Sequence, residues 1–156
     1  MVKKEKIIDF IQQHDRFVLD TSIWISYFEK EGSDLTKILK ENLFYENSEK
    51  LIYGNSYILS EIGYILCRLH GTKVSKETLS FIESAIIRVN SDKIFRIAAE
   101  IKCHFPISLS DCFSIATGKY QKCPILFKME EELSENRISE IEYMFKVQIV
   151  SISISS

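Results

Sequence analysis

The sequence predicts an α/β domain, a three-layer α/β/α sandwich with a mostly parallel central sheet. Apolar runs at 17–19 and 123–127 are typical of short strands buried on both faces, and β-branched residues at 86–89 indicate another strand. Segments in which apolar residues recur every three or four positions separate these runs, as in amphipathic helices. Strands that alternate with helices favour parallel pairing through right-handed crossovers. With 5 Gly and 2 Pro in 156 residues, we expect a single domain over 1–156.

In the first half of the chain, helices and strands are expected to alternate. An amphipathic helix over 3–13 lies in an N-terminal extension, 1–14, ahead of a core over 15–152. The strand at 17–19 ends at Asp20, and a helix follows to about 28. The next helix is capped by Ser33 or Asp34, and the residues at 51–53 either form a strand or end that helix. A turn at Gly54-Asn55 and an apolar helix that stops at His70-Gly71 follow.

The second half continues the same alternation. Ser75-x-x-Thr78 indicates the start of a helix to about 84, and the strand at 86–89 follows. The remaining elements are a helix capped within Asn90-Ser91-Asp92, a helix capped by Ser108 or Ser110 that begins near Asp111, the strand at 123–127, and a final edge strand over 147–152.

Composition argues against several classes of protein. The net charge of −2 provides no global basic field, so RNA would have to be held by local basic groups or through metal ions. We find no secretory signal and no apolar run long enough for a bilayer, which predicts a cytoplasmic protein with no membrane partner. Cys67, Cys103, Cys112 and Cys123 contain no C-x-x-C pair, so reduced thiols are expected. A zinc site at Cys103, His104 and Cys112 matches no common ligand spacing.

Four acidic residues take comparable places in the predicted sheet. Asp20 and Glu130 follow predicted strands. Glu61 and Asp111 lie in the first turns of predicted helices, where an acid can serve only to complement the helix dipole. Strand carboxyl ends and helix amino ends share one edge of a doubly wound sheet, so the four carboxylates are expected to converge. Converging carboxylates are neutralised by a hard cation such as Mg²⁺ or Mn²⁺, which can activate water to hydrolyse a phosphodiester.

Three motifs carry a resemblance to a known family. They are Val18-Leu19-Asp20-Thr21-Ser22, Leu59-Ser60-Glu61-Ile62 and Leu109-Ser110-Asp111-Cys112-Phe113-Ser114-Ile115-Ala116. With the strand at 124–127 and Glu130 after them, this order resembles the PIN-domain family of metal-dependent ribonucleases, which includes the VapC-type toxins. The resemblance spans about residues 16–150.

The resemblance implies a role for each of these positions. The catalytic, metal-binding acids would be Asp20, Glu61, Asp111 and Glu130, with Mg²⁺ or Mn²⁺ as the cofactor. Thr21 or Ser22 would orient Asp20 or a water molecule through its hydroxyl. The family's activity is endonucleolytic cleavage of RNA by a metal-activated water. Its toxin members form homodimers that a small antitoxin protein holds inactive.

The fourth motif departs from the family pattern Thr-x-Asp-x-x-Phe. Lys128 stands at the hydroxyl position, Glu130 at the Asp position and Leu133 at the Phe position. This departure keeps an alternative open, a catalytically weak or inactive PIN-like module that binds RNA or a protein partner. A phosphatase of the haloacid dehalogenase type would need a second Asp where Ser22 stands, and no glycine-rich loop follows a strand to hold a nucleotide.

Overall fold

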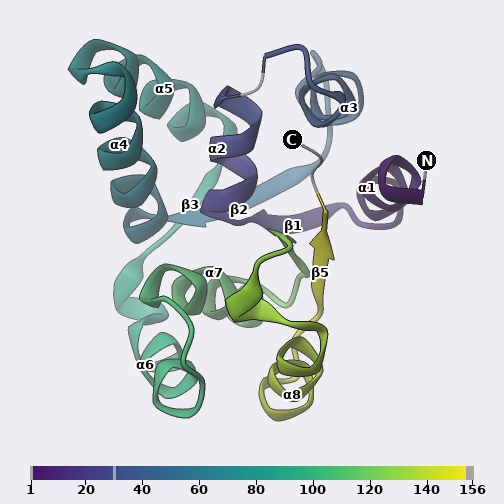
Figure 1. The fold of residues 1–156 in the computed structure, drawn as a ribbon, viewed down its shortest axis with the longest axis vertical. Helices are drawn as coiled ribbons and strands as arrows, with labels where there is room; N and C mark the ends of the chain where they lie inside the picture. Colours follow the sequence, from purple (N-terminus) through teal and green to yellow (C-terminus); the bar gives the residue numbers. More distant parts are fainter. Residues whose placement is uncertain (1, 30, 154–156) are drawn as a thin grey trace.

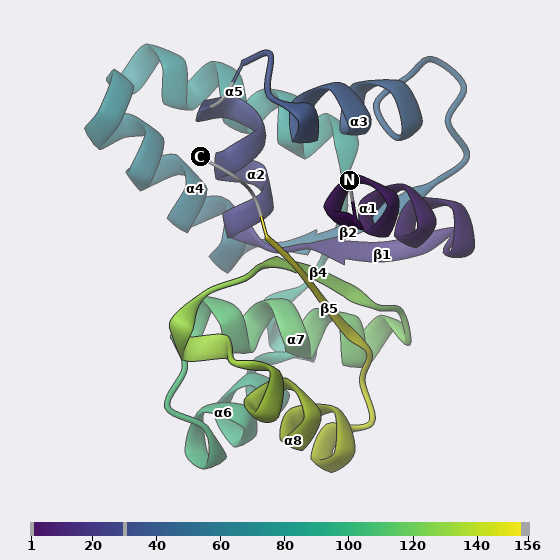
Figure 2. The same cartoon turned by 45° about the vertical axis from the view of Figure 1, so that its right-hand side comes forward.

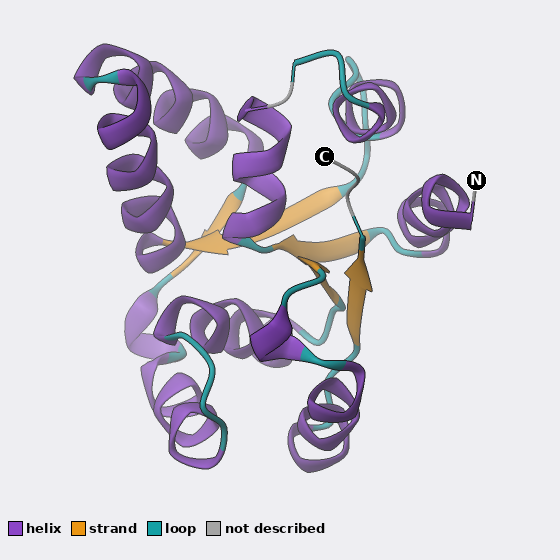
Figure 3. Ribbon diagram, in the orientation of Figure 1, coloured by secondary structure: helices purple, strands orange, loops and turns teal. Residues whose placement is uncertain are grey.

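The computed structural model of the chain describes residues 2–29 and 31–153. Its centre is a five-stranded sheet with the strand order β3-β2-β1-β4-β5, in which every pairing is parallel (Figure 3, orange). The strands are β1 (Arg16–Leu19), β2 (Leu51–Asn55), β3 (Ile87–Val89), β4 (Ile125–Lys128) and β5 (Ile149–Ile152).

Helices cover both faces of the sheet (Figures 1 and 2). One face carries α1 (Val2–Gln13), α2 (Thr21–Glu29), α3 (Asp34–Asn42), α4 (Ser56–His70) and α5 (Thr72–Ala85). The other carries α6 (Phe95–His104), α7 (Leu109–Gln121) and α8 (Glu135–Phe145), with short 3₁₀ turns η1 (Ser91–Lys93) and η2 (Glu131–Leu133) between elements. The predicted three-layer α/β/α class is therefore confirmed. None of the described helices combines the length and the apolar character that a membrane crossing requires.

Strand β1 lies at the centre because its apolar residues are buried on both faces. Phe17 and Leu19 belong to the hydrophobic cluster under α1–α5, whereas Val18 belongs to the cluster under α6–α8. Alternating side-chain direction along a strand produces this division. The chain runs outward from β1 to β2 and β3, and it then returns to β4 on the other side of β1. The strand order thus reverses between β1 and β4, which is where open α/β sheets bind ligands.

Backbone hydrogen bonds align the carboxyl ends of β1 and β4 at this reversal of strand order. The N–H of Val18 donates to the carbonyl of Pro124 at 2.9 Å, and the N–H of Asp20 donates to the carbonyl of Leu126 at 3.0 Å. Asp20 therefore follows β1 directly beside the carboxyl end of β4. The position of its carboxylate is fixed by the sheet rather than by a loop.

The turn predicted at Gly54-Asn55 is wrong, because both residues belong to β2. A Cβ added at Gly54 would lie 2.8 Å from Cδ1 of Ile86, so close packing explains this glycine. The side chain of Asn55 caps α4 by accepting a hydrogen bond from the N–H of Ile58 at 3.0 Å. The strand at 51–53 is confirmed, and the alternative that it ends the preceding helix is excluded.

Helix starts were predicted with mixed success. Ser33 and Ser108 cap α3 and α7, which decides between the candidates given for each helix. The start predicted at Ser75 is wrong, because α5 begins at Thr72 and the Ser75 hydroxyl donates to the carbonyl of Gly63 at 2.7 Å from inside the helix. Asn90 caps the 3₁₀ turn η1, and α6 begins only after that turn.

Two helices near the ends of the chain complete the core. Helix α1 packs on α3 and buries Ile7, Phe10 and Ile11. Helix α8 lies in a stretch to which the sequence analysis assigned no element, although Ile138 and Ile141 are buried at helical spacing. The predicted edge strand is β5, which pairs only with β4 among the described strands.

Candidate active site

The four acids singled out by the sequence line one cleft of about 330 Å³ at the carboxyl edge of the sheet. Asp20 follows β1 and Glu130 follows β4. Glu61 lies in the second turn of α4, and Asp111 lies in the first turn of α7. The residues come from four separate segments, and the topology of the sheet brings them to the reversal between β1 and β4.

Asp20 is buried and held by hydroxyl groups on both of its oxygens. Ser114 donates to Oδ1 at 2.5 Å, and the Ser22 hydroxyl donates to Oδ2 at 2.7 Å. The N–H of Ser22 also donates to Oδ2, at 3.0 Å, from the first turn of α2. Burial raises the pKa of Asp20, these hydrogen bonds lower it, and the negative charge of Glu61 raises it further. The net pKa is raised, so the hydrogen bonds orient this carboxyl group without fully offsetting the cost of burying its charge.

Asp111 is positioned by the start of α7. Ser108 caps this helix by accepting a hydrogen bond from the N–H of Asp111 at 3.1 Å. Burial raises the pKa of Asp111 to about 7, and the charges of Asp20, Glu130 and Glu61 act in the same direction. This carboxyl group therefore keeps its proton to a higher pH than an ordinary aspartate does, chiefly because it is buried and also because it lies among other acids.

Glu61 reaches the cleft from α4 and is linked to α7. The hydroxyl of Ser110 donates a short hydrogen bond to Oε2 of Glu61. The hydroxyl of Thr21 lies 3.4 Å from that of Ser110, so the first motif, Glu61 and α7 join in one hydroxyl network. Ser22 thus contacts Asp20 directly, whereas Thr21 contacts Ser110.

Glu130 lies at the exposed rim of the cleft. Desolvation and the charge of Asp20 raise its pKa, while the ammonium group of Lys128 lowers it. Glu132, in η2, also lines the cleft and adds to the negative charge around Glu130. The backbone N–H of Lys128 donates to the Ser22 hydroxyl at 3.1 Å, which ties the segment after β4 to the first motif.

Two packing features place α4 and α7 around the cleft. Asn55 is fully buried and donates to the hydroxyl of Thr117 in α7 at 2.8 Å while it caps α4. A Cβ added at Gly118 would lie 2.4 Å from Cδ1 of Ile125, so only glycine lets α7 lie this close to β4. These contacts fix the two helices that present Glu61 and Asp111.

The donors in the cleft fit a hard divalent cation in type. They are carboxylate oxygens, which Mg²⁺ and Mn²⁺ prefer, and burial together with the neighbouring acids raises the pKa of three of them. Within residues 2–29 and 31–153, no three Asp, Glu, His or Cys side chains form a ready-made metal-ion site. Cys112 is buried and Cys103 is exposed, so two members of the zinc site that the spacing argued against lie in different environments.

Sequence reasoning missed the two serines of α7 that hold the acids. Ser114 was quoted only as part of a motif, and Ser110 was considered as a helix cap, whereas it bonds Glu61 and Ser108 forms the cap. The two serines are four residues apart and so share one face of the helix, a signal that could have placed them beside the acids. Their partners are 49 and 94 residues away along the chain, which no local pattern reveals.

A family model for the PIN domain matches residues 17–138, most of the chain. The chain belongs to the PIN-domain family. The match runs from β1 into α8 and so contains all four acids of the cleft. The comparison with curated proteins finds no match for this PIN-domain chain.

Solved structures with the same fold include bacterial toxin–antitoxin proteins. A DNA-bound VapBC from Salmonella typhimurium has a TM-score of 0.62 at 13% identity, covering 88% of this chain and 98% of that one. VapBC2 from Rickettsia felis, bound to a DNA fragment from its promoter, has a TM-score of 0.59 at 14% identity, covering 87% and 98%. VapC20 from Mycobacterium tuberculosis, a toxin that cleaves the sarcin-ricin loop, has a TM-score of 0.54 at 15% identity, covering 70% and 86%. At these identities the likeness establishes the PIN fold.

Proposed function

We propose that this PIN-domain protein is an Mg²⁺- or Mn²⁺-dependent endoribonuclease that hydrolyses RNA phosphodiesters, and that it acts as a VapC-like toxin. The observation that carries the proposal is the single cleft at the strand reversal that Asp20, Glu61, Asp111 and Glu130 line together. Titratable groups with raised pKa values in a cleft are a feature of functional sites. Membership of the PIN-domain family supports the same reaction class.

Each acid has a distinct task in this proposal. Asp20 is the fixed metal ligand, because Ser114 and Ser22 set the direction of both its oxygens. Asp111 is the ligand that gives up its proton on metal binding, since its pKa of about 7 makes that loss easy near neutral pH. Glu61 and Glu130 flank them and complete an all-oxygen donor set. When bound, the cation lowers the pKa of a water molecule and offsets the negative charge of the phosphodiester.

The partners follow from the same proposal. Structural neighbours include VapBC from Haemophilus influenzae and FitAB bound to a DNA fragment. These neighbours support a small antitoxin protein as the partner that holds the nuclease inactive, and RNA is the substrate that the ribonuclease proposal itself requires. A homodimer in the cytoplasm is the form in which the protein is proposed to act.

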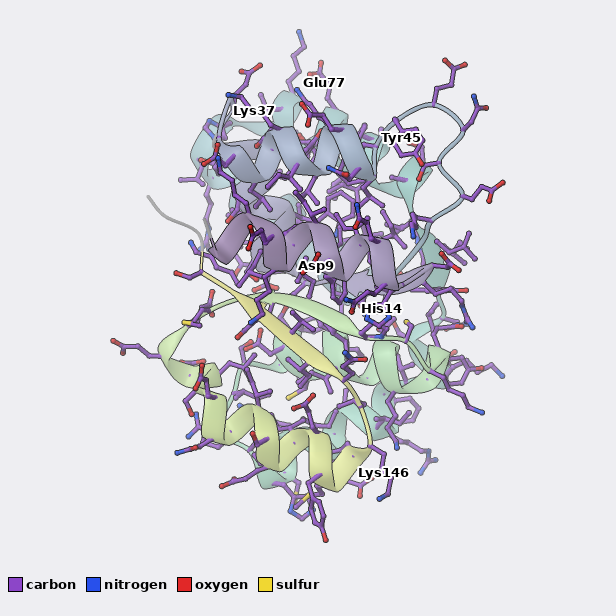
Figure 4. All side chains as sticks on the ribbon, turned by 90° about the vertical axis from the view of Figure 1, so that its right-hand side faces the viewer. Asp9, His14, Lys37, Tyr45, Glu77 and Lys146 are labelled. Carbon is purple, nitrogen blue, oxygen red and sulfur yellow. The ribbon has the colours of Figure 1, made fainter. Side chains whose placement is uncertain are left out.

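A metal-supplemented cleavage assay tests the proposal. Wild type, Asp20→Asn and Asp111→Asn are incubated with structured and unstructured RNA in Mn²⁺ or Mg²⁺. We expect both variants to cleave at least about a hundredfold more slowly than wild type, because each loses a carboxylate ligand. Asp9→Asn, which removes an exposed carboxylate of α1 (Figure 4), is the matched control and should cleave like wild type. Equal cleavage by all four proteins would assign the activity to a contaminant or to another site.

A Mn²⁺ titration separates this nuclease from the non-cutting alternative. Wild type should bind the ion at micromolar to millimolar concentrations, and Asp20→Asn should bind it more weakly. If wild type binds no divalent ion at millimolar levels, the nuclease proposal is lost. The interpretation as an inactive module that binds RNA or a protein then takes its place.

A further inference from the structure

A second pocket opens beside the acidic cleft and is aromatic rather than charged. It has a volume of about 340 Å³, within the range of small-molecule sites, and lies between α4 and the start of α7. Its walls are Tyr57, Ser60, Glu61, Tyr64, Ser108, Leu109 and Ser110. Glu61 and Ser108 also line the acidic cleft, so the two sites are continuous.

The aromatic rings of this pocket are held in place and remain accessible. The ring of Tyr57 stacks on that of Phe113, with centroids 4.6 Å apart and planes 4° apart. Tyr64 is 50% exposed, Tyr57 37% and Leu109 39%, which leaves apolar surface open to solvent next to a charged cleft. The guanidinium of Arg68 lies 5.1 Å from the centroid of the Tyr64 ring and brings a positive charge to the rim.

Without a bound cation, the acidic cleft does not attract an RNA strand. Its carboxylates repel phosphate groups. The net charge of the chain is −2, so the protein as a whole does not attract the negatively charged RNA backbone either. Stacking of bases on aromatic side chains provides affinity that does not depend on net charge. Single-stranded RNA is the form that offers such bases, because its bases can turn outward onto aromatic rings.

We propose that the pocket formed by Tyr57, Tyr64 and Leu109 binds one base of a single-stranded RNA whose adjacent phosphodiester lies in the acidic cleft, an inference that rests on the proposed ribonuclease function. Tyr64 supplies the accessible stacking surface, and Tyr57 is braced by Phe113. The hydroxyl of the exposed Ser60 is a polar group of the pocket that can meet the edge of the base. Arg68 lies where it can contact the phosphate of a neighbouring nucleotide.

Binding of an end-labelled single-stranded oligoribonucleotide, followed by fluorescence anisotropy, tests the proposal. All proteins are full-length chains that also carry Asp20→Asn, so that cleavage does not interfere. We expect Tyr64→Ala to raise Kd by about 5- to 100-fold, the range found when a base-stacking ring is removed. Tyr64→Phe keeps the ring and should stay within about twofold of its parent. Tyr143→Ala removes a ring of α8 that is 84% exposed and outside the pocket, and it should change nothing.

Abasic oligoribonucleotides show whether a base occupies the pocket. At one position of the strand, removing the base while keeping the ribose should weaken binding by the same factor as Tyr64→Ala. The two changes together should weaken it no further, since they remove the two halves of one contact. Unchanged Kd in Tyr64→Ala, or full additivity of the two losses at every position, would overturn the proposal.

Oligomeric state and cleavage provide the remaining outcomes. If sedimentation shows a wild-type dimer that Tyr64→Ala converts to monomer, a second copy of the chain covers this pocket and the base-binding proposal is overturned. If wild type cleaves RNA but Tyr64→Ala binds the strand normally, only the pocket assignment fails. If the binding results are as expected but wild type does not cleave RNA with any divalent ion, the nuclease proposal fails and the base-binding pocket stands.

Discussion

Two cavities of opposite charge lie at opposite ends of strand β4. The carboxyl end meets the cleft of Asp20, Glu61, Asp111 and Glu130. The amino ends of β4 and β5 meet a larger cavity of about 580 Å³, whose basic residues are His14, Lys119, Lys122 and Lys146. Figure 4 labels His14 at the end of α1 and Lys146 after α8, on one side of the molecule.

The two cavities differ in where their charges find partners. Lys119 donates to the carbonyl of Phe145 at 2.7 Å, and Lys122 and Lys146 form the C-caps of α7 and α8, where positive charge complements the helix dipole. The lysines are thus explained by the fold itself.

In the cleft, Asp20 is held by serine donors, and Lys128 in its lining acts on the exposed Glu130. Burial and the neighbouring acids raise the pKa of Asp20 and of Asp111. The basic cavity is thus accounted for by helix ends, whereas the acidic cleft is the site that the proposed function uses.

The largest expected difference between the cavities is in RNA cleavage. Asp111→Asn should lower the rate at least about a hundredfold, because a ligand of the cation is lost. Lys122→Gln should leave the rate within about twofold, because this lysine serves the end of α7. Initial rates with Mn²⁺ at one RNA concentration are sufficient. A large loss in Lys122→Gln would show that the basic cavity takes part in the reaction.

The pH dependence of metal binding comes next in size. Because Asp111 has a pKa of about 7, Mn²⁺ must displace a proton below that pH. The Kd for Mn²⁺ should therefore fall roughly tenfold per pH unit between pH 5 and 7 and level off above. Isothermal titration calorimetry in two buffers of different ionisation enthalpy measures both affinity and proton release. A flat profile in wild type, or the same slope in Asp111→Asn, would contradict the assignment.

Removal of the Ser114 hydroxyl that holds Asp20 should lower the free energy of unfolding by a moderate amount. Ser114→Ala leaves Oδ1 of the buried Asp20 without its donor, and we expect the free energy of unfolding to fall by about 1–3 kcal/mol. Ser139→Ala, which removes an exposed helix serine that donates only to its own α8 backbone, should cost less than about 0.5 kcal/mol. Urea unfolding of the metal-free proteins gives both values, and equal losses would mean that Ser114 has no special role.

The metal-free protein should also lose stability as pH rises. The folded pKa of Asp111 is raised above its ordinary value, so its contribution is fully present below about pH 4 and is lost as pH rises through about 7. Asp111→Asn should unfold with the same free energy as wild type at pH 4 and about 4 kcal/mol more at pH 8. Denaturant unfolding in EDTA at both pH values tests the sign, and a wild type that is more stable at pH 8 would contradict it.

The smallest effect is expected at the basic cavity. Lys146→Gln removes a charge near the end of α8 but keeps the left-handed backbone and its N–H bond to Glu142, so stability should fall by a few tenths of a kcal/mol. The same urea experiments measure it. A loss above about 1 kcal/mol would mean that the lysines support the fold more strongly than a helix cap does.

The sequence predicted the parts of the molecule that local patterns encode. The buried runs that became β1 and β4 and the acids after them follow from residue type and spacing, which also narrowed the cap of α7 to Ser108 or Ser110. Gly54-Asn55 was misjudged because the packing of Ile86 against Gly54 is a tertiary contact. Helix α8 was missed although its pattern is local, since Ile138, Ile141 and Phe145 recur at helical spacing after the Ser134 cap. The hydroxyl donors to Asp20 and Glu61 depend on how α7 lies across the sheet, which only the folded chain defines.

The bond between Lys128 and Ser22 has an evolutionary consequence. Its donor is a main-chain amide, which every residue except proline supplies, so the link between the first and fourth motifs does not depend on the side chain at position 128. The family-typical hydroxyl can therefore drift to lysine without loosening the wall of the cleft. This hydrogen bond can therefore be kept by any residue at position 128 except proline, which has no backbone N–H.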